Sequence, residues 1–453
     1  MPSKPKFVSE VKKKKEEEVV MQQIAERRNK LKLISLKKLT EVIEKHILIA
    51  DPHILKMMVA TIIANKLPGD PVWIFLVGPS GGGKTMFLDL LKEMPEIYPL
   101  SNLTPSTFIS GQQQTKGLLF EIDKKILTFK DFTTILQLYQ EARNEIMSQL
   151  REIYDGSYKK AFGTGQAKEW NGKIGFIAGV TSVIDVTAQL YSALGERFIQ
   201  YRLQTPDREE VAMVALDNSG RSRELQREAR EEMQLAFEGC VRAVEEKIEK
   251  DNEIGIKIEM DYTQKTKLIK MANFATLARS AVMRDAGPSK EIYYKPTAEM
   301  PTRFTQQLNH IALALIHINR AQGLTATLTP DDELILYKIA LDSIPMMRRI
   351  MLQKLVEFDL SQTSLIATLT NYPSNTARRF LEDLNVLGII ERKKDKNKDY
   401  WMIKDQFKDL LITYDNVKPL PPEERMMIEA DIATRMMEDF GEKDLFEGAE
   451  VTP

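Results

Sequence analysis

The sequence predicts an α/β fold in which a sheet-and-helix core is followed by helices and then by a smaller module of helices and strands. Three observations indicate this order. Short apolar segments alternate with helical ones from about residue 46 to residue 206. Residues 207–325 are charged and rich in Glu, Arg, Ala, Leu and Met, which is typical of helices. Residues 326–410 then contain helical segments and two short apolar strands around a lysine-rich turn.

Composition excludes several classes of protein. A length of 453 residues suits two or three domains, and a formal net charge of -1 argues against a chain that coats nucleic acid along its whole length. The single cysteine, Cys240, excludes an internal disulfide and a multi-cysteine zinc site. The longest apolar run, residues 72–77, is far shorter than the roughly 20 residues of a membrane span. We therefore expect a cytoplasmic protein with no membrane partner.

The two ends of the chain have opposite charge. Residues 1–45 carry thirteen lysines and arginines against seven acids, which predicts a basic helical arm. This arm is either a solvated helix or a segment that touches phosphates. From residue 421 onward there are ten acids against three bases, so we expect residues 411–453 to form a disordered acidic tail.

A glycine-rich loop follows the apolar strand at 72–77 and opens a helical segment at 86–94. Its spacing is GxxxxGK[ST], which supplies backbone N–H groups, a helix N-terminus and glycines that let a phosphate approach. We therefore expect a nucleoside triphosphate here, with Lys84 at the β and γ phosphates and Thr85 on Mg²⁺. The loop consists of Gly78, Pro79, Ser80, Gly81, Gly82, Gly83, Lys84 and Thr85.

Polar residues at the ends of later strands are candidates for the chemistry. Asp131 ends the segment ILTFKD and is the expected second ligand of Mg²⁺, but the next position, where an acid commonly activates water, holds Phe132. The base is therefore either Glu152 or Glu121, or hydrolysis is slow. Thr181 ends the strand at 175–180 and either orients a water or forms a turn.

Two arginines complete the set of candidates. Arg197 in the sequence GERF precedes a strand-like run. An arginine in this place can complete the nucleotide site of a neighbouring subunit and offset the charge that develops during phosphoryl transfer. The alternative is a surface ion pair with Glu196. The segment PTRF places Arg303 at the start of a long amphipathic helix.

The order GPSGGGKT, ILTFKDF, GFIAGVT, GERF and PTRF resembles AAA+ ATPases, and most nearly the minichromosome-maintenance-like replicative helicases, including those of phages and mobile elements. The resemblance covers roughly residues 47–325. It implies an AAA+ core over 46–206, a helical lid over 207–325, ATP as the nucleotide and a ring, with a homo-hexamer expected. It assigns Asp131 to the metal, Thr181 to the sensor 1 position, Arg197 to the arginine finger and Arg303 to the sensor 2 position. Departures are Phe132, a threonine at position 181 in place of the commoner asparagine, and the lack of a cysteine-rich zinc module.

Two surfaces are candidates for DNA binding. In helicases of this kind a hairpin before the sensor 1 strand enters the ring channel, and the equivalent stretch here, 158–170, interleaves lysines with aromatic residues. The alternative is an ordinary hairpin with buried aromatics. Residues 326–410 have the outline of a winged helix-turn-helix, which binds DNA or docks a protein. The basic candidates are Lys159, Lys160 and Lys168 in the hairpin, Arg378 and Arg379 on the second helix, and Lys393 and Lys394 on the wing.

Three functions follow from these observations. The first is an ATP-driven DNA helicase or translocase, acting as a ring in phage or mobile-element replication beside other replication proteins. The second is an ATP-switch initiator or helicase loader that binds DNA through its winged helix and turns over slowly, which Phe132 favours. The third is an ATP-dependent regulator of protein partners.

Overall fold

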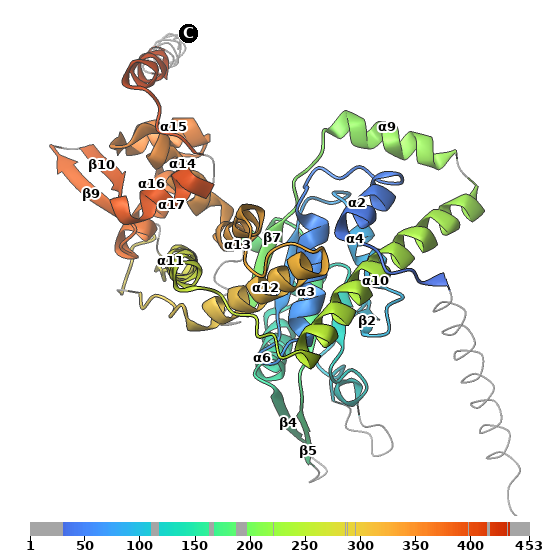
Figure 1. The fold of residues 1–453 in the computed structure, drawn as a ribbon. Helices are drawn as coiled ribbons and strands as arrows, with labels where there is room; N and C mark the ends of the chain where they lie inside the picture. Colours follow the sequence, from blue (N-terminus) through green and yellow to red (C-terminus); the bar gives the residue numbers. More distant parts are fainter. Residues whose placement is uncertain are drawn as a thin grey trace, which may run out of the picture.

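A computed structural model describes residues 30–109, 117–162, 167–186, 197–220, 222–285, 287, 289–294, 296–396, 398–414, 417–432 and 434 (Figure 1). Within this part the central element is a five-stranded sheet with the order β2-β3-β6-β1-β7. Every neighbouring pair of these strands is parallel. The predicted α/β class is therefore confirmed. The strands are β1 (Trp73–Val77), β2 (Ile97–Leu100), β3 (Ile126–Phe129), β6 (Gly175–Val180) and β7 (Phe198–Arg202).

Both faces of the sheet are covered, as the alternation of side chains along β1 shows. Ile74 and Leu76 belong to one hydrophobic cluster, while Trp73, Phe75 and Val77 belong to the other. Because both faces are buried, the strand is apolar at every position rather than at alternate ones. The first cluster includes helices α3 (Ile54–Lys66), α4 (Lys84–Leu91), α10 (Arg223–Glu253) and α12 (Thr302–Ala321), and the second includes α5 (Thr133–Leu136) and α6 (Gln140–Tyr154).

The helical region after the last strand packs closely on the core. Helix α10 contacts α3, α4 and α2 (Leu36–Glu44), and α13 (Pro330–Asp342) packs against β7. Figure 1 shows α3, α10 and α12 together in front of the sheet. Helix α9 (Arg208–Ser219) lies at the end of the molecule opposite β4 and β5 (Figure 1), and α11 (Tyr262–Arg279) packs against α12 and α13.

Part of the predicted basic arm is packed rather than solvated. Leu39 and Ile43 of α2 are fully buried against the first cluster. Ser35 accepts a hydrogen bond from the backbone N–H of Lys38 and so caps the helix. Residues 1–29 of the arm lie outside the described residues.

The C-terminal module has the predicted order of helices followed by a strand pair. Its three-stranded sheet has the order β8-β10-β9, with Trp401 of β10 fully buried against the helices. The elements are α14 (Met346–Phe358), β8 (Ser361–Gln362), α15 (Thr363–Thr370), α16 (Ser374–Val386), β9 (Ile390–Asp395), β10 (Lys398–Ile403) and α17 (Asp405–Tyr414).

Disorder was the wrong prediction for the first part of the acidic tail. Residues 405–414 belong to α17, and residues 422–432 are also helical. The guanidinium of Arg425 donates to the Leu360 carbonyl, 2.8 Å away, and pairs with Glu429 one turn later. The contact with Leu360 ties residues 422–432 to the C-terminal module. Residues 435–453 lie outside the described part.

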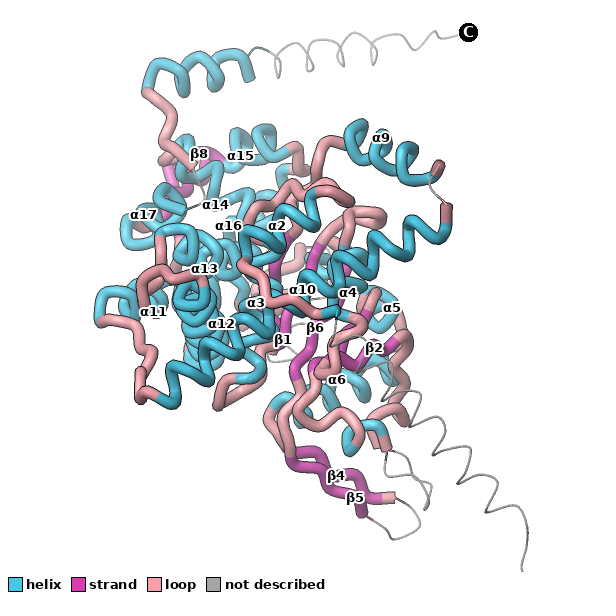
Figure 2. Tube along the Cα trace, turned by 45° about the vertical axis from the view of Figure 1, so that its right-hand side comes forward, coloured by secondary structure: helices cyan, strands magenta, loops and turns pink. Residues whose placement is uncertain are grey.

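The stretch predicted as a hairpin, 158–170, contains two strands that pair with each other. Strands β4 (Ser157–Ala161) and β5 (Ala167–Asn171) pair with each other in a sheet of their own, and β6 then enters the central sheet. The two strands project from the body of the protein (Figure 2).

Candidate functional site: the glycine-rich loop and the arginine face

The glycine-rich loop, Gly78–Thr85, leaves the carboxyl end of β1 and enters α4. Gly81 and Gly83 have φ angles of 77° and 84°, which side-chain-bearing residues rarely adopt. Lys84, the first residue of α4, folds back so that its Nζ donates to the carbonyls of Gly78 and Pro79, each at 2.7 Å. The Lys84 side chain therefore bridges back to the first two residues of the loop and closes it.

The environment of Lys84 links it to the next strand. The residue is 7% exposed, and burial lowers the pKa of its ammonium group, while the charge of Asp131 opposes that shift. Asp131 lies two residues after the end of β3, and the partner of β3, strand β6, lies beside β1. Since the carboxyl ends of parallel strands meet at one edge, Asp131 and the loop share that edge.

A polar cluster joins the two candidate residues that follow β3 and β6. The Asp131 carboxylate accepts from the backbone N–H of Thr133 at 3.0 Å. The hydroxyls of Thr133 and Thr181 are 3.2 Å apart, and the backbone N–H of Thr181 donates to the Thr133 hydroxyl at 3.1 Å. Thr133 thus connects Asp131 to Thr181. No sequence motif marked Thr133, which is the first residue of α5.

Phe132 faces away from this cluster and belongs to the core. It is fully buried, and its ring centroid lies 4.9 Å from that of Phe75 and 5.7 Å from that of Phe198. Its backbone N–H donates to the Gly179 carbonyl at 2.7 Å. The residue after Asp131 is therefore a packing position here, which accounts for the apolar side chain.

We expect Phe132→Glu to destabilise the protein without creating a catalytic base. The carboxylate would be buried among aromatic rings, so the free energy of unfolding should fall by more than about 4 kcal/mol. Phe132→Leu keeps the position apolar and should cost about 1–2 kcal/mol. Urea unfolding followed by circular dichroism measures both. A stable Glu variant with faster nucleotide turnover would show that the side chain can turn towards Asp131.

Glu152, predicted as a base, lies at the other end of the sheet. It precedes Tyr154, whose ring packs 5.2 Å from that of Trp73, the first residue of β1. A five-residue strand is about 15 Å long, so Glu152 cannot reach the loop that follows β1 in the same chain. Glu121, the other candidate, precedes β3 and lies at the same far end. The prediction of Glu152 as the base for its own loop is wrong.

The two candidate arginines meet at this far end and form what we call the arginine face, with Arg197 and Arg303 over the ring of Tyr154. Their guanidinium carbons lie 5.6 Å and 5.9 Å from the ring centroid. Arg197 pairs with Asp155 at 2.5 Å, and Gln307 Nε2 donates to the Arg197 carbonyl. Burial lowers the pKa of Arg197, an effect that Asp155 opposes. Burial also raises the pKa of Tyr154.

A cavity of about 700 Å³ adjoins the glycine-rich loop. It lies between the loop, residues 46–51, residues 203–206 and the inner side of α9, at the opposite end of the sheet from the arginine face. Its size and largely apolar walls suit a nucleoside next to a phosphate site. The lining outside the loop includes His46, Ile47, Asp51, Leu203, Pro206 and Val211.

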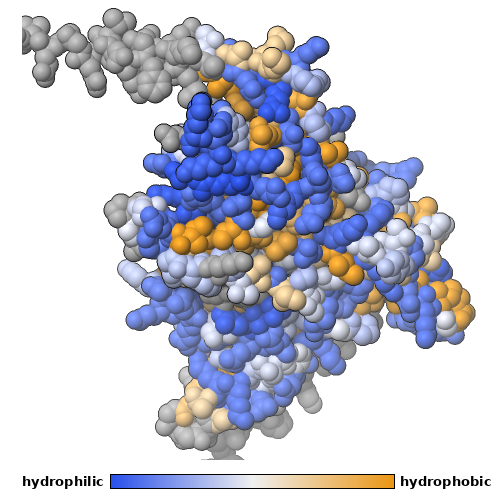
Figure 3. All heavy atoms as spheres, turned by 90° about the vertical axis from the view of Figure 1, so that its left-hand side faces the viewer, coloured by the Kyte–Doolittle hydropathy of each residue, from blue (hydrophilic) through white to orange (hydrophobic). Residues whose placement is uncertain are grey.

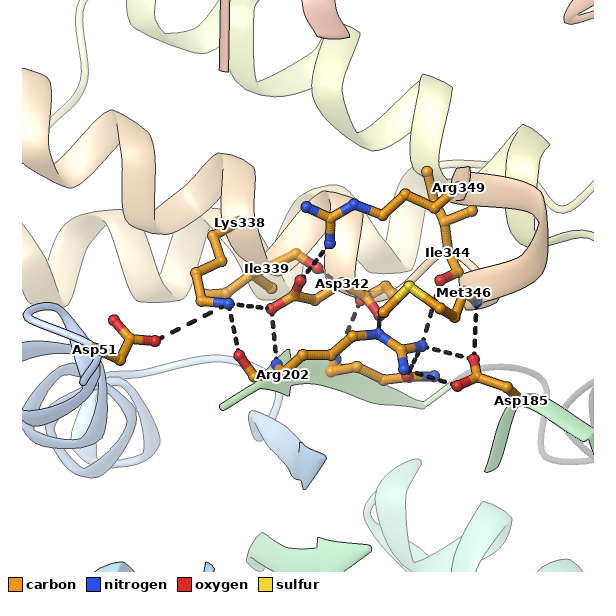
Figure 4. A network of polar contacts seen from close by, with 11 residues as sticks. Asp51, Asp185, Arg202, Lys338, Ile339, Asp342, Ile344, Met346 and Arg349 are labelled. Carbon is orange, nitrogen blue, oxygen red and sulfur yellow. Dashed lines mark hydrogen bonds and ion pairs between the residues drawn. The ribbon is translucent and has the colours of Figure 1, made fainter. Parts of the chain in front are cut away.

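An ion-pair network lies beside this cavity (Figure 4). Arg202, at the end of β7, forms two hydrogen bonds to the Asp185 carboxylate, at 2.7 and 2.8 Å. Its backbone N–H donates to Asp342 of α13, which also pairs with Lys338. Lys338 Nζ also lies 4.0 Å from Oδ2 of Asp51, a residue of the cavity wall. The network thus joins the end of the sheet to the C-terminal helices, and no sequence motif marked it.

The hairpin exposes fewer of its aromatic residues than expected. Tyr158 and Trp170 are opposite each other in the register and are only 7% and 3% exposed, so stacking on bases by these two rings was a wrong prediction. Lys160 and Lys168 form the next pair on the same face towards the tip. Lys159 lies on the other face and pairs with Glu169.

The basic residues of the C-terminal module lie mostly at its surface. Arg378 is exposed and pairs with Glu382, whereas Arg379 is half-buried. Lys393 and Lys394 are exposed on β9. The side of the molecule that carries β9 and β10 in Figure 1 is mostly hydrophilic, with a smaller hydrophobic band across it (Figure 3).

Comparison with known proteins gives no family. No protein-family model matches the chain, and no curated protein matches it. Within the described ranges, no helix combines the length and apolar character of a membrane span. The same residues contain no cluster of three or more His, Cys, Asp or Glu side chains that could hold a metal ion.

Proposed function

We propose that the protein is an ATPase whose sites are completed between subunits of a ring and which moves along or remodels DNA. The observation that carries this proposal is the separation of two half-sites. The glycine-rich loop lies at the carboxyl ends of the strands, whereas Arg197 and Arg303 lie together where the strands begin.

The loop and its cavity support nucleotide binding. The backbone N–H groups at the start of α4 and the Lys84 ammonium would hold the phosphates, and the cavity would hold the nucleoside. Thr85 and Asp131 are both exposed residues at this edge, and hydroxyl and carboxylate oxygens are hard donors that suit Mg²⁺. Bound there, Mg²⁺ would offset the negative charge of the phosphates.

The arginine face supports assembly. Two guanidinium groups gathered about 15 Å from their own loop can serve a phosphate only if that phosphate belongs to another copy. A subunit that supplies arginines on one side and accepts a neighbour's arginines on the other forms a head-to-tail interface, the kind of contact from which closed rings are built. We propose a homo-hexamer.

The first test measures ATP hydrolysis and the size of the assembly in parallel. ATP hydrolysis is measured without DNA and with single- or double-stranded DNA, and mass photometry with and without ATP reports the size of the assembly. We expect DNA to raise the rate and ATP to favour the ring. A monomer that hydrolyses ATP at full rate would contradict the shared site.

The paired hairpin lysines give a prediction for DNA. Lys160→Ala with Lys168→Ala should remove most of the DNA stimulation and leave the rate without DNA unchanged. For single strands, losing two phosphate contacts should make the slope of log affinity against log salt shallower by about 1.4. The matched control is Lys257→Ala with Lys265→Ala, which removes the same charge from exposed positions elsewhere. Equal stimulation in both double variants would contradict the proposal.

An ATP switch is the second candidate, and the burial of Phe132 favours it. With no carboxylate after Asp131, bound ATP would persist and hold one conformation, as an initiator or helicase loader requires. Strand displacement by the purified protein distinguishes the two, because a helicase separates a duplex and a switch does not.

A further inference from the structure

The ion pair between Arg197 and Asp155 holds the Arg197 guanidinium against its own subunit. Arg197 is 4% exposed, with its Nη2 2.5 Å from Asp155 Oδ2 and its guanidinium above the Tyr154 ring. The Asp155 side chain, in contrast, is half exposed. In this position the guanidinium cannot contact a phosphate on a second molecule, and it must leave the carboxylate to do so.

Asp155 lies at the base of the hairpin. It caps the end of α6, and Gly156 follows with a φ of 83° before β4 begins at Ser157. The backbone N–H of Gly172, just after β5, donates to the Gly156 carbonyl at 3.0 Å. Both strands of the hairpin are therefore anchored within two residues of the carboxylate, so tilting the hairpin displaces Asp155.

We propose that Asp155 is a positioning residue that withholds Arg197 from the neighbouring subunit's nucleotide until the hairpin moves. This inference rests on the proposed function. A carboxylate and a phosphate compete for the same donors of one guanidinium. A nucleic acid that shifts β4 and β5 would pull Asp155 away and release Arg197. The hairpin thereby couples DNA contact to hydrolysis at the interface.

The test is Asp155→Asn, which removes the charge and keeps the size of the side chain. Without DNA, kcat for ATP should rise at least about five-fold, with KM changed less than two-fold. The remaining stimulation by single-stranded DNA should shrink by the same factor. Asp155→Glu, which restores a carboxylate, should bring kcat back towards the original value. If the Asn variant does not fold, Asp155→Ser gives the same comparison.

A matched control and a second measurement make the outcome specific. Asp359→Asn breaks the ion pair between Asp359 and Lys408 in the C-terminal module. The Asp359 carboxylate is about as exposed as that of Asp155, so this variant should leave kcat unchanged. Thermal unfolding of each variant reports stability separately. An unchanged or lower kcat for Asp155→Asn, while the unmodified chain hydrolyses ATP and Arg197→Ala does not, overturns this inference alone. No ATP hydrolysis by the unmodified chain would overturn the proposed function instead.

Discussion

Lys84→Ala should abolish nucleotide turnover. The ammonium group closes the glycine-rich loop through Gly78 and Pro79, and on phosphate binding it would exchange these carbonyls for phosphate oxygens. The opposing charge of Asp131 helps to keep it protonated despite its burial. Loss of one charge-stabilising donor commonly lowers kcat by about 10²–10³, and here the loop also loses its closing contacts. A coupled assay of ATP hydrolysis and nucleotide titration measure both effects.

Lys130→Ala is the matched control for this variant. Lys130 is exposed beside Asp131 and pairs with Asp89 of α4 at 3.1 Å. Its replacement by alanine therefore removes the same charge from the same edge of the sheet. We expect its kcat to stay within about three-fold of the original, as for the loss of a surface ion pair. If Lys84→Ala and Lys130→Ala had similar rates, the loop would not be the phosphate site.

The parallel sheet was predictable because its strands are short apolar runs that end in polar residues. The segments before Gly78, Asp131 and Thr181 became β1, β3 and β6, and parallel pairing then fixed their ends at one edge. Strand β2 was missed because it contains Pro99, which weakens the strand signal. That proline is tolerated because β2 is at the edge of the sheet.

Other features depended on contacts that no local pattern encodes. The apolar residues 118–120 form a short 3₁₀ turn, η1 (Leu118–Phe120), and join none of the sheets in the described part of the chain. Residues 167–171 form a strand through their pairing with residues 157–161. The proximity of Arg197 to Arg303 depends on the packing of α12 beside the start of β7, more than 100 residues earlier in the chain.

Arg197→Ala should abolish turnover and spare nucleotide binding. The guanidinium is proposed to act on a neighbour's phosphate, so its own loop and cavity are untouched by the change. The fold should tolerate the loss, because Gln307 bonds the main-chain carbonyl of residue 197 and Asp155 is half exposed. We expect kcat to fall by about 10³ with a dissociation constant for nucleotide within two-fold. Arg151→Ala, an exposed arginine on the same side, is the control and should keep its activity.

Mixing two inactive variants tests the shared site most directly. Lys84→Ala lacks a working loop but keeps Arg197, and Arg197→Ala lacks the arginine but keeps Lys84. In a ring assembled from equal amounts, roughly a quarter of the interfaces combine an intact loop with an intact arginine. ATP hydrolysis should therefore reappear on mixing, above the sum of the two separate rates. A site contained within one chain gives no such recovery, since every subunit in the mixture carries a defect.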